Sequence, residues 1–427
     1  MKRVLIITYY WPPNGGAGVQ RWLKMAKYLP QQGWQPVVYT PENPEIITPD
    51  EGLVKEVPAE AEIIKRPISE PYSFYKRLTG RKADEKVHLG FLNEGKKKSW
   101  REDLAVWIRG NAFIPDARVW WVKPSVKFLT GYLRDHPVDA IVSTGPPHSM
   151  HLIALGLKKK FPKVRWIADW RDPWTNIDFY HQLKLTAWAD RKHHRLERDV
   201  IANADVNVAV GWTMAEELKA LGAKRTEVIT NGYDPDDVPS PPVALDDAYS
   251  LVHVGNMTAT RDIPQLWPML AELCRAYDDF GSKFKLRFIG PVDHGVLASI
   301  ERAGLSAKVE RIGSVDHVQA MCEMQRARVL LLSVNDTANA KGVLTSKVFE
   351  YLAVGRPILA FGPKDGDIAR VLGGGHLLVD RKESLPDARA MAAMFERPVG
   401  GSLNAASSRV AGAEQMGGLL AASDRAR

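Results

Sequence analysis

One stretch, residues 341–361 (KGVLTSKVFEYLAVGRPILAF), constrains the fold of this chain more than any other part. Its first half has apolar residues at helical spacing, and Gly355 and Pro357 are typical of the end of a helix. The unbroken apolar run at residues 358–361 is typical of a strand covered on both faces. Residues 329–334 (VLLLSV) form a second such run just upstream. The sequence therefore predicts strand, loop, helix and strand, the repeating unit of a parallel α/β sheet.

The N-terminus of this predicted helix lies at the carboxyl edge of the sheet, where α/β proteins bind ligands. Thr345 and Ser346 are good helix-capping residues at this edge. Glu350 lies among apolar neighbours, one position past the place where a capping glutamate belongs, so capping does not explain it. It is either a solvated residue of the helix surface or a carboxylate that accepts hydrogen bonds from ligand hydroxyls, such as those of a ribose.

The composition of the 427 residues bears on the number of domains, the expected partners and the compartment. The length suits two domains, and the excess of 58 basic over 50 acidic residues favours anionic partners: nucleic acid, acidic lipid or phosphorylated ligands. Cys274 and Cys322 are the only cysteines, which favours a reducing compartment over a disulfide framework.

His193 and His194 are adjacent and lack the spacing of metal ligands, so we expect no metal site. No segment has the roughly 20 apolar residues that span a bilayer, and the apolar start is interpreted as a strand, so we expect a cytoplasmic protein.

The first residues predict another strand, loop and helix. Residues 4–8 form the strand and residues 20–29 the helix, with Gly15, Gly16 and Gly18 in the loop between them. Glycines there let the backbone approach a ligand, and a helix N-terminus favours phosphate. The spacing does not match G-x-G-x-x-G, so a dinucleotide site is not indicated. The loop either binds an anion or simply turns.

Basic and aromatic residues alternate within residues 60–128. They include the lysines at 96–98 and Trp107, Trp120 and Trp121. This mixture suits the interface of an anionic membrane, where aromatic rings lie at headgroup level and basic side chains meet phosphate. The alternative is a solvated surface with tryptophans in the core. No nucleic-acid-binding module is visible, so nucleic acid is not the expected partner.

Two polar clusters follow predicted strands in the first half. His148 lies in the first (STGPPHS), and Asp169 and Arg171 lie in the second (DWRDPW), beside Trp170 and Trp174. His148 is either a proton shuttle, a ligand for hydroxyls or a structural histidine. The second cluster is either an ion-pair network within a loop or a grip on sugar hydroxyls and phosphate, with a tryptophan as a stacking platform.

A proline-rich, acidic segment divides the chain. We expect an N-terminal Rossmann-like domain at residues 1–233, a linker at 234–249, and a second at 250–394. The tail at 395–427 is rich in Gly, Ala and Ser and weakly specified, with one helix at 410–422. The predicted architecture is two doubly wound parallel sheets facing across a cleft.

Charged side chains of the second domain suggest a phosphate site. Arg261 follows a loop that begins at Gly255, and Lys347 lies on the helix that carries Glu350. The two cations would neutralise a diphosphate while the glutamate holds a ribose. For Arg261 alone, an ordinary surface role is the alternative.

The motifs together resemble the retaining glycosyltransferases of family four, which have the GT-B fold. The resemblance covers nearly the whole chain, and SKVFEYLAVGRPILA is its most specific part. It is carried by residues 15–16, 231–232, 255–261 and 346–357. The segments STGPPHS and DWRDPW resemble a subgroup that acts in surface-polysaccharide assembly.

This resemblance implies that the C-terminal domain binds a nucleotide-diphosphate sugar and that the N-terminal domain binds the acceptor. Glu350 is similar to the ribose-binding glutamate, and Arg261 to a basic residue on the diphosphate. Gly15 and Gly16 are similar to the loop whose amides face the diphosphate and the transferred sugar. The implied activity is sugar transfer with retention, without a metal ion and with no cofactor besides the sugar-nucleotide substrate.

Three positions depart from the family pattern. Gly342, next to Lys341, stands eight residues before Glu350, where the family has a first carboxylate. Asn256 replaces an arginine, and Arg171 takes the place of a histidine. The missing carboxylate affects the contacts to the donor sugar.

Asp169, His148 and the hydroxyls of Thr345 and Ser346 are candidates to replace that carboxylate. The expected enzyme is a hexosyltransferase that uses a lipid-linked or polysaccharide acceptor on the inner face of the membrane. Two alternatives remain: a sugar-nucleotide epimerase of the same fold, and a degenerate, non-catalytic scaffold protein at the membrane.

Overall fold

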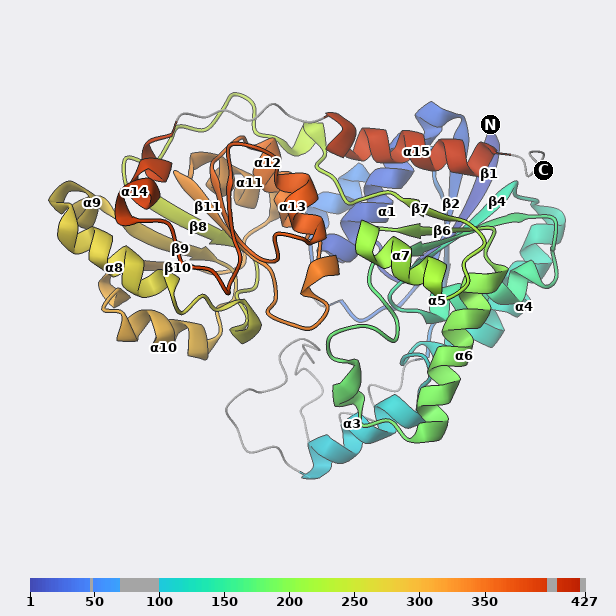
Figure 1. Ribbon diagram of the computed structural model, residues 1–427. Coiled ribbons are helices and arrows are strands. Elements are labelled where there is room, and N and C mark those ends of the chain that lie inside the picture. The colour runs from blue at the N-terminus through green and yellow to red at the C-terminus, as the bar shows by residue number, and fades with distance from the viewer. Residues whose placement is uncertain (47–48, 70–99, 398–404, 423–427) are drawn as a thin grey trace. The chain divides into compact units, whose positions relative to one another are not determined.

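The computed structural model describes residues 1–46, 49–69, 100–397 and 405–422, and the chain forms two compact units. Unit 1 comprises Met1–Ile229 and Ala413–Arg427, and unit 2 comprises Thr230–Gly412. Figure 1 shows that each unit has its own sheet with helices on both faces. None of the helices within the described ranges is long and apolar enough to cross a bilayer.

Unit 1 contains a parallel sheet in the order β3-β2-β1-β4-β5-β6-β7. Its inner strands are buried apolar runs, because helices cover both faces of the sheet. The described strands are β1 (Lys2–Ile7), β2 (Trp34–Pro41), β3 (Glu62–Arg66), β4 (Ala140–Gly145), β5 (Arg165–Trp170), β6 (Val206–Ala209) and β7 (Thr226–Val228). The helices are α1 (Ala17–Tyr28), α3 (Trp100–Ala112), α4 (Val119–Asp135), α5 (Ser149–Lys158), α6 (Ala187–Asn203) and α7 (Trp212–Ala220).

Unit 2 contains a second parallel sheet, in the order β10-β9-β8-β11-β12-β13. Its strands are β8 (Ser250–Val254), β9 (Lys285–Ile289), β10 (Val309–Ile312), β11 (Val329–Ser333), β12 (Ile358–Phe361) and β13 (Leu377–Val379). Its helices are α8 (Leu266–Ala276), α9 (Asp278–Lys283), α10 (His294–Arg302), α11 (His317–Arg326), α12 (Lys347–Ala353), α13 (Asp367–Leu372) and α14 (Ala388–Glu396), and α15 (Arg409–Ala421) begins in this unit.

The stretch at residues 341–361 folds as its sequence predicts. β11 and β12 are neighbouring parallel strands in which Leu330 pairs with Ile358, and α12 lies between them in the chain. Gly355 has φ +69°, the left-handed conformation expected just after this helix. The capping differs from expectation, because Ser346 is the N-cap residue of α12 but its hydroxyl makes no capping hydrogen bond.

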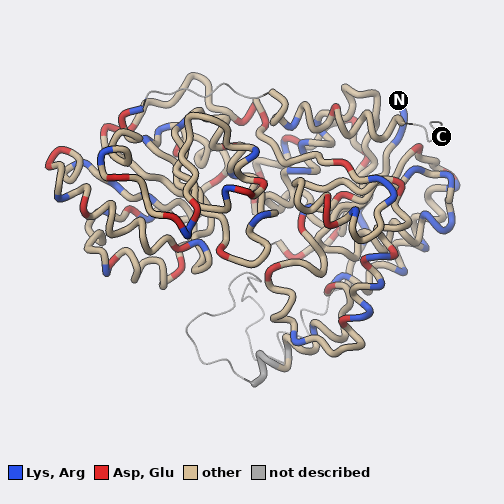
Figure 2. The backbone as a smooth tube through the Cα atoms, viewed as in Figure 1, with Lys and Arg blue, Asp and Glu red and all other residues tan. Residues whose placement is uncertain are grey.

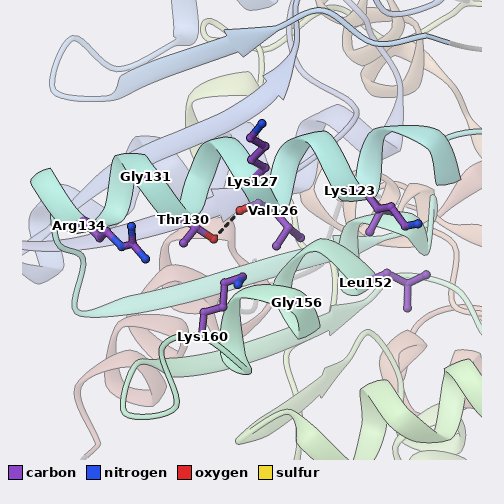
Figure 3. Close-up of a pocket in the computed structure, with 10 residues that line it drawn as sticks. Lys123, Val126, Lys127, Thr130, Gly131, Arg134, Leu152, Gly156 and Lys160 are labelled. Carbon is purple, nitrogen blue, oxygen red and sulfur yellow. Dashed lines mark hydrogen bonds between the residues drawn. The ribbon is translucent and has the colours of Figure 1, made fainter.

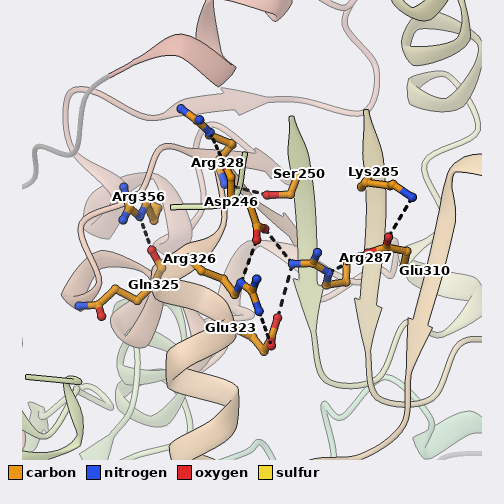
Figure 4. Close-up of polar contacts among 10 residues, drawn as sticks. All are labelled: Asp246, Ser250, Lys285, Arg287, Glu310, Glu323, Gln325, Arg326, Arg328 and Arg356. Atoms are coloured by element: carbon orange, nitrogen blue, oxygen red, sulfur yellow. Dashed lines mark hydrogen bonds and ion pairs between the residues drawn. The ribbon is translucent and has the colours of Figure 1, made fainter. Parts of the chain in front are cut away.

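The division into units differs from the predicted domains. The boundary falls after Ile229 because Tyr233 exchanges backbone hydrogen bonds with Ser407 and Arg409 of unit 2. The predicted linker at 234–249 also belongs to unit 2. Its Asp246 is buried and accepts hydrogen bonds from Arg287 Nη1 and Arg326 Nε, each at 2.8 Å (Figure 4).

Residues 405–422 pack more closely than the composition of the predicted tail suggests. The predicted helix at 410–422 corresponds to α15, and Ala413, Met416 and Leu420 are buried on it. From residue 413 onward this segment belongs to unit 1, where a Cβ at Gly417 would lie 2.9 Å from the side chain of Gln32. Small residues therefore let α15 approach unit 1 closely, which composition alone does not reveal.

Candidate functional site

The predicted site residues of unit 2 gather around Gly255, directly after β8. Gly255 has φ +94°, and a Cβ at this position would lie 2.6 Å from Lys347 Nζ. Glycine is therefore required both for the backbone conformation and for the approach of the lysine. Lys347 is the first residue of α12, so the end of β8 and the start of α12 meet at this point.

Arg261 lies beside Lys347 and is held in place by its own hydrogen bonds. Its Nε donates to Asn335 Oδ1 at 2.6 Å, and its Nη1 donates to the backbone oxygen of Asn256 at 2.7 Å. Burial, followed by the positive charge of Arg261, lowers the pKa of Lys347 to about 7, although Glu350 opposes this shift. Two cations thus share a half-buried position that would favour an anion.

Glu350 is half-buried on α12, and none of the described side chains donates a hydrogen bond to its carboxylate. Burial raises its pKa, as does Asp237, while His317, Arg409 and Lys347 lower it. A carboxylate with its acceptor positions available and cations nearby can receive hydrogen bonds from ligand hydroxyls.

Gly342 occupies the position where the family has its first carboxylate. Gly342 ends a short 3-10 helix, and Lys341 beside it forms an exposed ion pair with Asp365 at 2.5 Å. Thr345 and Ser346, two of the candidate replacements, lie half-buried just before α12. Among the described residues the Ser346 hydroxyl has no hydrogen-bond partner, and Thr345 Oγ1 accepts only a long hydrogen bond, 3.4 Å, from the backbone nitrogen of Lys347.

Asp169 of unit 1 is fully buried, and other side chains of the unit hydrogen-bond its carboxylate. Its carboxylate accepts hydrogen bonds from Arg21 Nη2 (2.7 Å), Trp22 Nε1 (2.7 Å) and Thr144 Oγ1 (2.8 Å). Burial alone would raise the pKa of Asp169, but Arg21 and the three hydrogen-bond donors outweigh burial and lower it. The prediction that Asp169 grips sugar hydroxyls is corrected here, because the residue ties α1 to β4 and β5 instead.

Trp170 and Trp174, the predicted stacking platforms, also contact other residues of unit 1. Trp170 is buried, and its Nε1 donates to Asn207 Oδ1 at 2.9 Å. Trp174 is buried against His148, with ring centroids 4.7 Å apart and planes 7° from parallel. Neither indole face is therefore offered to a sugar.

His148 is 8% exposed, and its Nδ1 has no hydrogen-bond partner among the described residues. Burial, then the nearby His151 and Arg171, lowers its pKa well below the usual value, so the ring is a neutral base. Arg171 is half-buried, and its guanidinium lies over the ring of Tyr10 at 5.5 Å. A Cβ at Gly18 would lie 2.6 Å from Arg171 Nη1, so the structure brings Arg171 to the glycine loop.

Gly15 and Gly16 immediately precede α1, and Gly16, with φ +89°, is its N-cap residue. The predicted loop before the first helix is therefore confirmed, although the helix begins at Ala17 rather than at residue 20. Arg21 and His151 were not predicted as site residues. Each is a polar residue on a helix face that is otherwise buried, and this pattern is the signal that could have identified them.

The buried histidines make unit 1 sensitive to acid. Burial, together with Arg171 and against the opposing effect of Asp169, lowers the pKa of His151 to about 3, whereas an unfolded histidine has a pKa of about 6.5. The unfolded chain therefore binds more protons below this pH, and the free energy of unfolding should fall by about 1.4 kcal/mol per pH unit for each such histidine.

Calorimetric melting between pH 7.5 and 5 checks this expectation. We expect His151→Gln to flatten the pH dependence of the melting temperature, while His181→Gln, at an exposed position, leaves it unchanged. Equal slopes for the native protein and His151→Gln would contradict the assignment.

Comparison with known proteins adds a family and a fold. A model of the family described as "Glycosyl transferase 4-like domain" matches residues 15–232, about half of the chain. A search of curated proteins found no match.

Solved structures match over nearly the full length. Sucrose-phosphate synthase from Thermosynechococcus elongatus has a TM-score of 0.57 at 15% identity, with 98% of this chain and 95% of that chain covered. An α,α-trehalose-phosphate synthase from Burkholderia xenovorans has 0.58 at 11%, with 98% and 100% covered. WaaG, a glycosyltransferase involved in lipopolysaccharide biosynthesis, has 0.52 at 12%, with 99% and 96% covered. The likeness shows the GT-B fold, and it confirms the predicted fold class of two Rossmann-like, parallel-sheet domains.

Proposed function

Because the chain belongs to the glycosyl transferase 4-like family, we propose that it transfers a hexose from a nucleotide-diphosphate sugar to a hydroxyl of a lipid-linked or polysaccharide acceptor. Transfer proceeds with retention and without a metal ion or further cofactor. The observation that carries this proposal is the cluster in unit 2, where Lys347 and Arg261 adjoin a carboxylate that no described side chain hydrogen-bonds.

The roles of these residues follow from their chemistry. Lys347 and Arg261 stabilise the negative charge that develops on the departing diphosphate, which is the main electrostatic demand of this reaction. Glu350 accepts hydrogen bonds from the ribose hydroxyls and fixes the nucleoside. Gly15 and Gly16 present backbone amides in unit 1, and Arg171 adds positive charge near Gly18, two residues further along the chain. His148 is neutral, because burial lowers its pKa, and its Nδ1 can hydrogen-bond an acceptor hydroxyl.

Two observations favour a membrane-linked acceptor. The net charge of +8 favours anionic surfaces, and one structural neighbour acts in lipopolysaccharide biosynthesis. We place the enzyme at the inner face of the membrane as a peripheral protein.

A donor screen followed by product analysis tests this function. Calorimetry with uridine, guanosine and adenosine diphosphate sugars should find one donor, and nuclear magnetic resonance of the product should show the donor's anomeric configuration, with chelator present. Conversion of free donor to another sugar nucleotide would indicate an epimerase. Donor binding without transfer to any acceptor would indicate a scaffold protein.

The lowered pKa of Lys347 predicts a proton effect on donor binding. With a pKa of about 7, the lysine is mostly neutral at pH 8, and a bound diphosphate raises that pKa because it favours the charged form. Binding should therefore take up a proton, and affinity should fall up to about tenfold per pH unit above pH 7.

Calorimetry at pH 8 in two buffers of different ionisation enthalpy measures this uptake. It should vanish in Lys347→Met and persist in Lys382→Met, which changes an exposed lysine of the same unit. A binding enthalpy that does not depend on the buffer would remove Lys347 from the diphosphate site.

A further inference from the structure

One face of α4 carries a stripe of five exposed residues, three of which are basic. Trp120, Lys123, Lys127, Gly131 and Arg134 recur three or four positions apart and are exposed, so they lie along one side of the helix. Trp120 is 53% exposed, which is unusual for so large an apolar ring. Figure 2 shows blue, basic segments where Figure 1 labels α4.

A groove of about 490 Å³ runs between this stripe and α5 (Figure 3). Its floor is apolar: Val126 and Leu152 line it, and the hydroxyl of Thr130 donates to the backbone oxygen of Val126. Gly156 lets α5 approach α4 closely, because a Cβ at this position would lie 2.6 Å from the side chain of Val126. Lys160, just after α5, lies on the opposite side of the groove.

The charges around this groove are unbalanced. The groove is lined by Lys123, Lys127, Arg134 and Lys160. Within the described part of the chain none of these four forms an ion pair, and no acidic residue lines the groove. Lys123 and Lys127 are four positions apart on α4, a like-charge arrangement that destabilises a helix. The arginines around Asp246 differ, because they are matched by carboxylates (Figure 4).

The predicted membrane patch at residues 60–128 falls only partly on this surface. Residues 70–99, which include the lysines at 96–98, lie outside the described residues. Trp121 is buried in the core of unit 1, whereas Trp107 and Trp120 are exposed. The groove and the predicted patch therefore share Lys123 and Lys127, whereas Arg134 and Lys160 lie beyond the patch in the chain.

We infer that the groove between α4 and α5 docks unit 1 on a bilayer of anionic phospholipid. Basic side chains at the rim meet headgroup phosphates, and Trp120 lies at the level of the headgroups. The apolar floor accepts the part of a lipid next to its headgroup. A soluble phosphate would use the cations but would gain nothing from Trp120 or the apolar floor. This inference rests on the proposed peripheral location, but it does not require transfer activity.

Vesicle co-sedimentation tests the surface directly. The full chain should bind vesicles that contain about one third phosphatidylglycerol and should not bind pure phosphatidylcholine. Each basic residue near such a surface contributes about 1 kcal/mol, so reversing two of them should weaken binding more than tenfold. The test variant is Lys123→Glu with Lys127→Glu, and Trp120→Ala should weaken binding several-fold.

A matched control separates the groove from total charge. Lys224→Glu with Lys382→Glu makes the same change in net charge at exposed positions away from α4, and it should retain most binding. Equal losses in both double variants, or equal binding to neutral and anionic vesicles, would overturn the inference. So would a groove-dependent affinity for inorganic phosphate or an RNA oligonucleotide without vesicle binding.

Donor calorimetry distinguishes the two proposals. Both double variants should bind the nucleotide sugar like the native protein, because neither change touches the unit 2 cluster. Vesicle binding by a protein that binds no donor would refute the function and keep the docking surface. Donor binding and transfer without vesicle binding would refute the docking surface alone.

Discussion

Replacing Glu350 with alanine is expected to weaken binding of the nucleotide-sugar donor by at least about a hundredfold. Hydrogen bonds to a charged group contribute about 1.5–3 kcal/mol each, and a ribose diol offers two of them to one carboxylate. Each 1.4 kcal/mol corresponds to a tenfold change in the dissociation constant. Isothermal titration calorimetry with the donor found in the screen measures the effect.

Stability measurements show whether this loss reflects binding alone. Burial raises the pKa of Glu350, and no described side chain hydrogen-bonds its carboxylate, so Glu350→Gln should melt at the same or a higher temperature than the native protein. Glu301→Gln, at an exposed position on α10, is the matched control and should bind donor normally. Unchanged donor affinity in Glu350→Ala would remove the central residue of the proposed site.

Replacing Asp169 with asparagine is expected to lower the free energy of unfolding of unit 1 by about 3–5 kcal/mol. The substitution leaves the guanidinium of Arg21 buried without its counter-charge, which is costly in a low-dielectric interior. Because the pKa of Asp169 is lowered by its partners, its stabilising effect is present at neutral pH and is lost as the pH falls through the folded-state value. Urea unfolding at pH 7 measures the change.

A surface ion pair provides the comparison for this substitution. Lys219→Met removes an exposed pair with Glu216 in the same unit, and such pairs contribute about 0–1 kcal/mol. If Asp169→Asn lowers the free energy of unfolding by no more than Lys219→Met does, the buried pair does not hold α1 to the sheet as its contacts indicate.

Patterns that are local in the sequence predicted the elements well. The apolar runs at 329–334 and 358–361 became β11 and β12 because a strand buried on both faces needs apolar residues at consecutive positions. Gly355 was predictable for a similar reason, since the end of a helix favours a residue that tolerates positive φ.

Contacts between distant residues were not predictable in this way. Arg21 and Asp169 are far apart in the chain, and each alone was compatible with a surface role. The stacking of His148 on Trp174 likewise depends on how two loops meet. Asp246 looked like part of an acidic linker until its arginine partners were located on β9 and α11. Sequence patterns record local geometry, whereas these pairs are set by packing.

The division of the chain has a practical consequence for work on the separate units. Because unit 1 is assembled from residues 1–229 and the last part of α15, unit 2 is inserted within it. A fragment that stops at residue 229 would lack the helix that contacts Gln32 and would leave that surface uncovered. An independently folding N-terminal half would therefore need α15 restored, for example by circular permutation or as an added peptide.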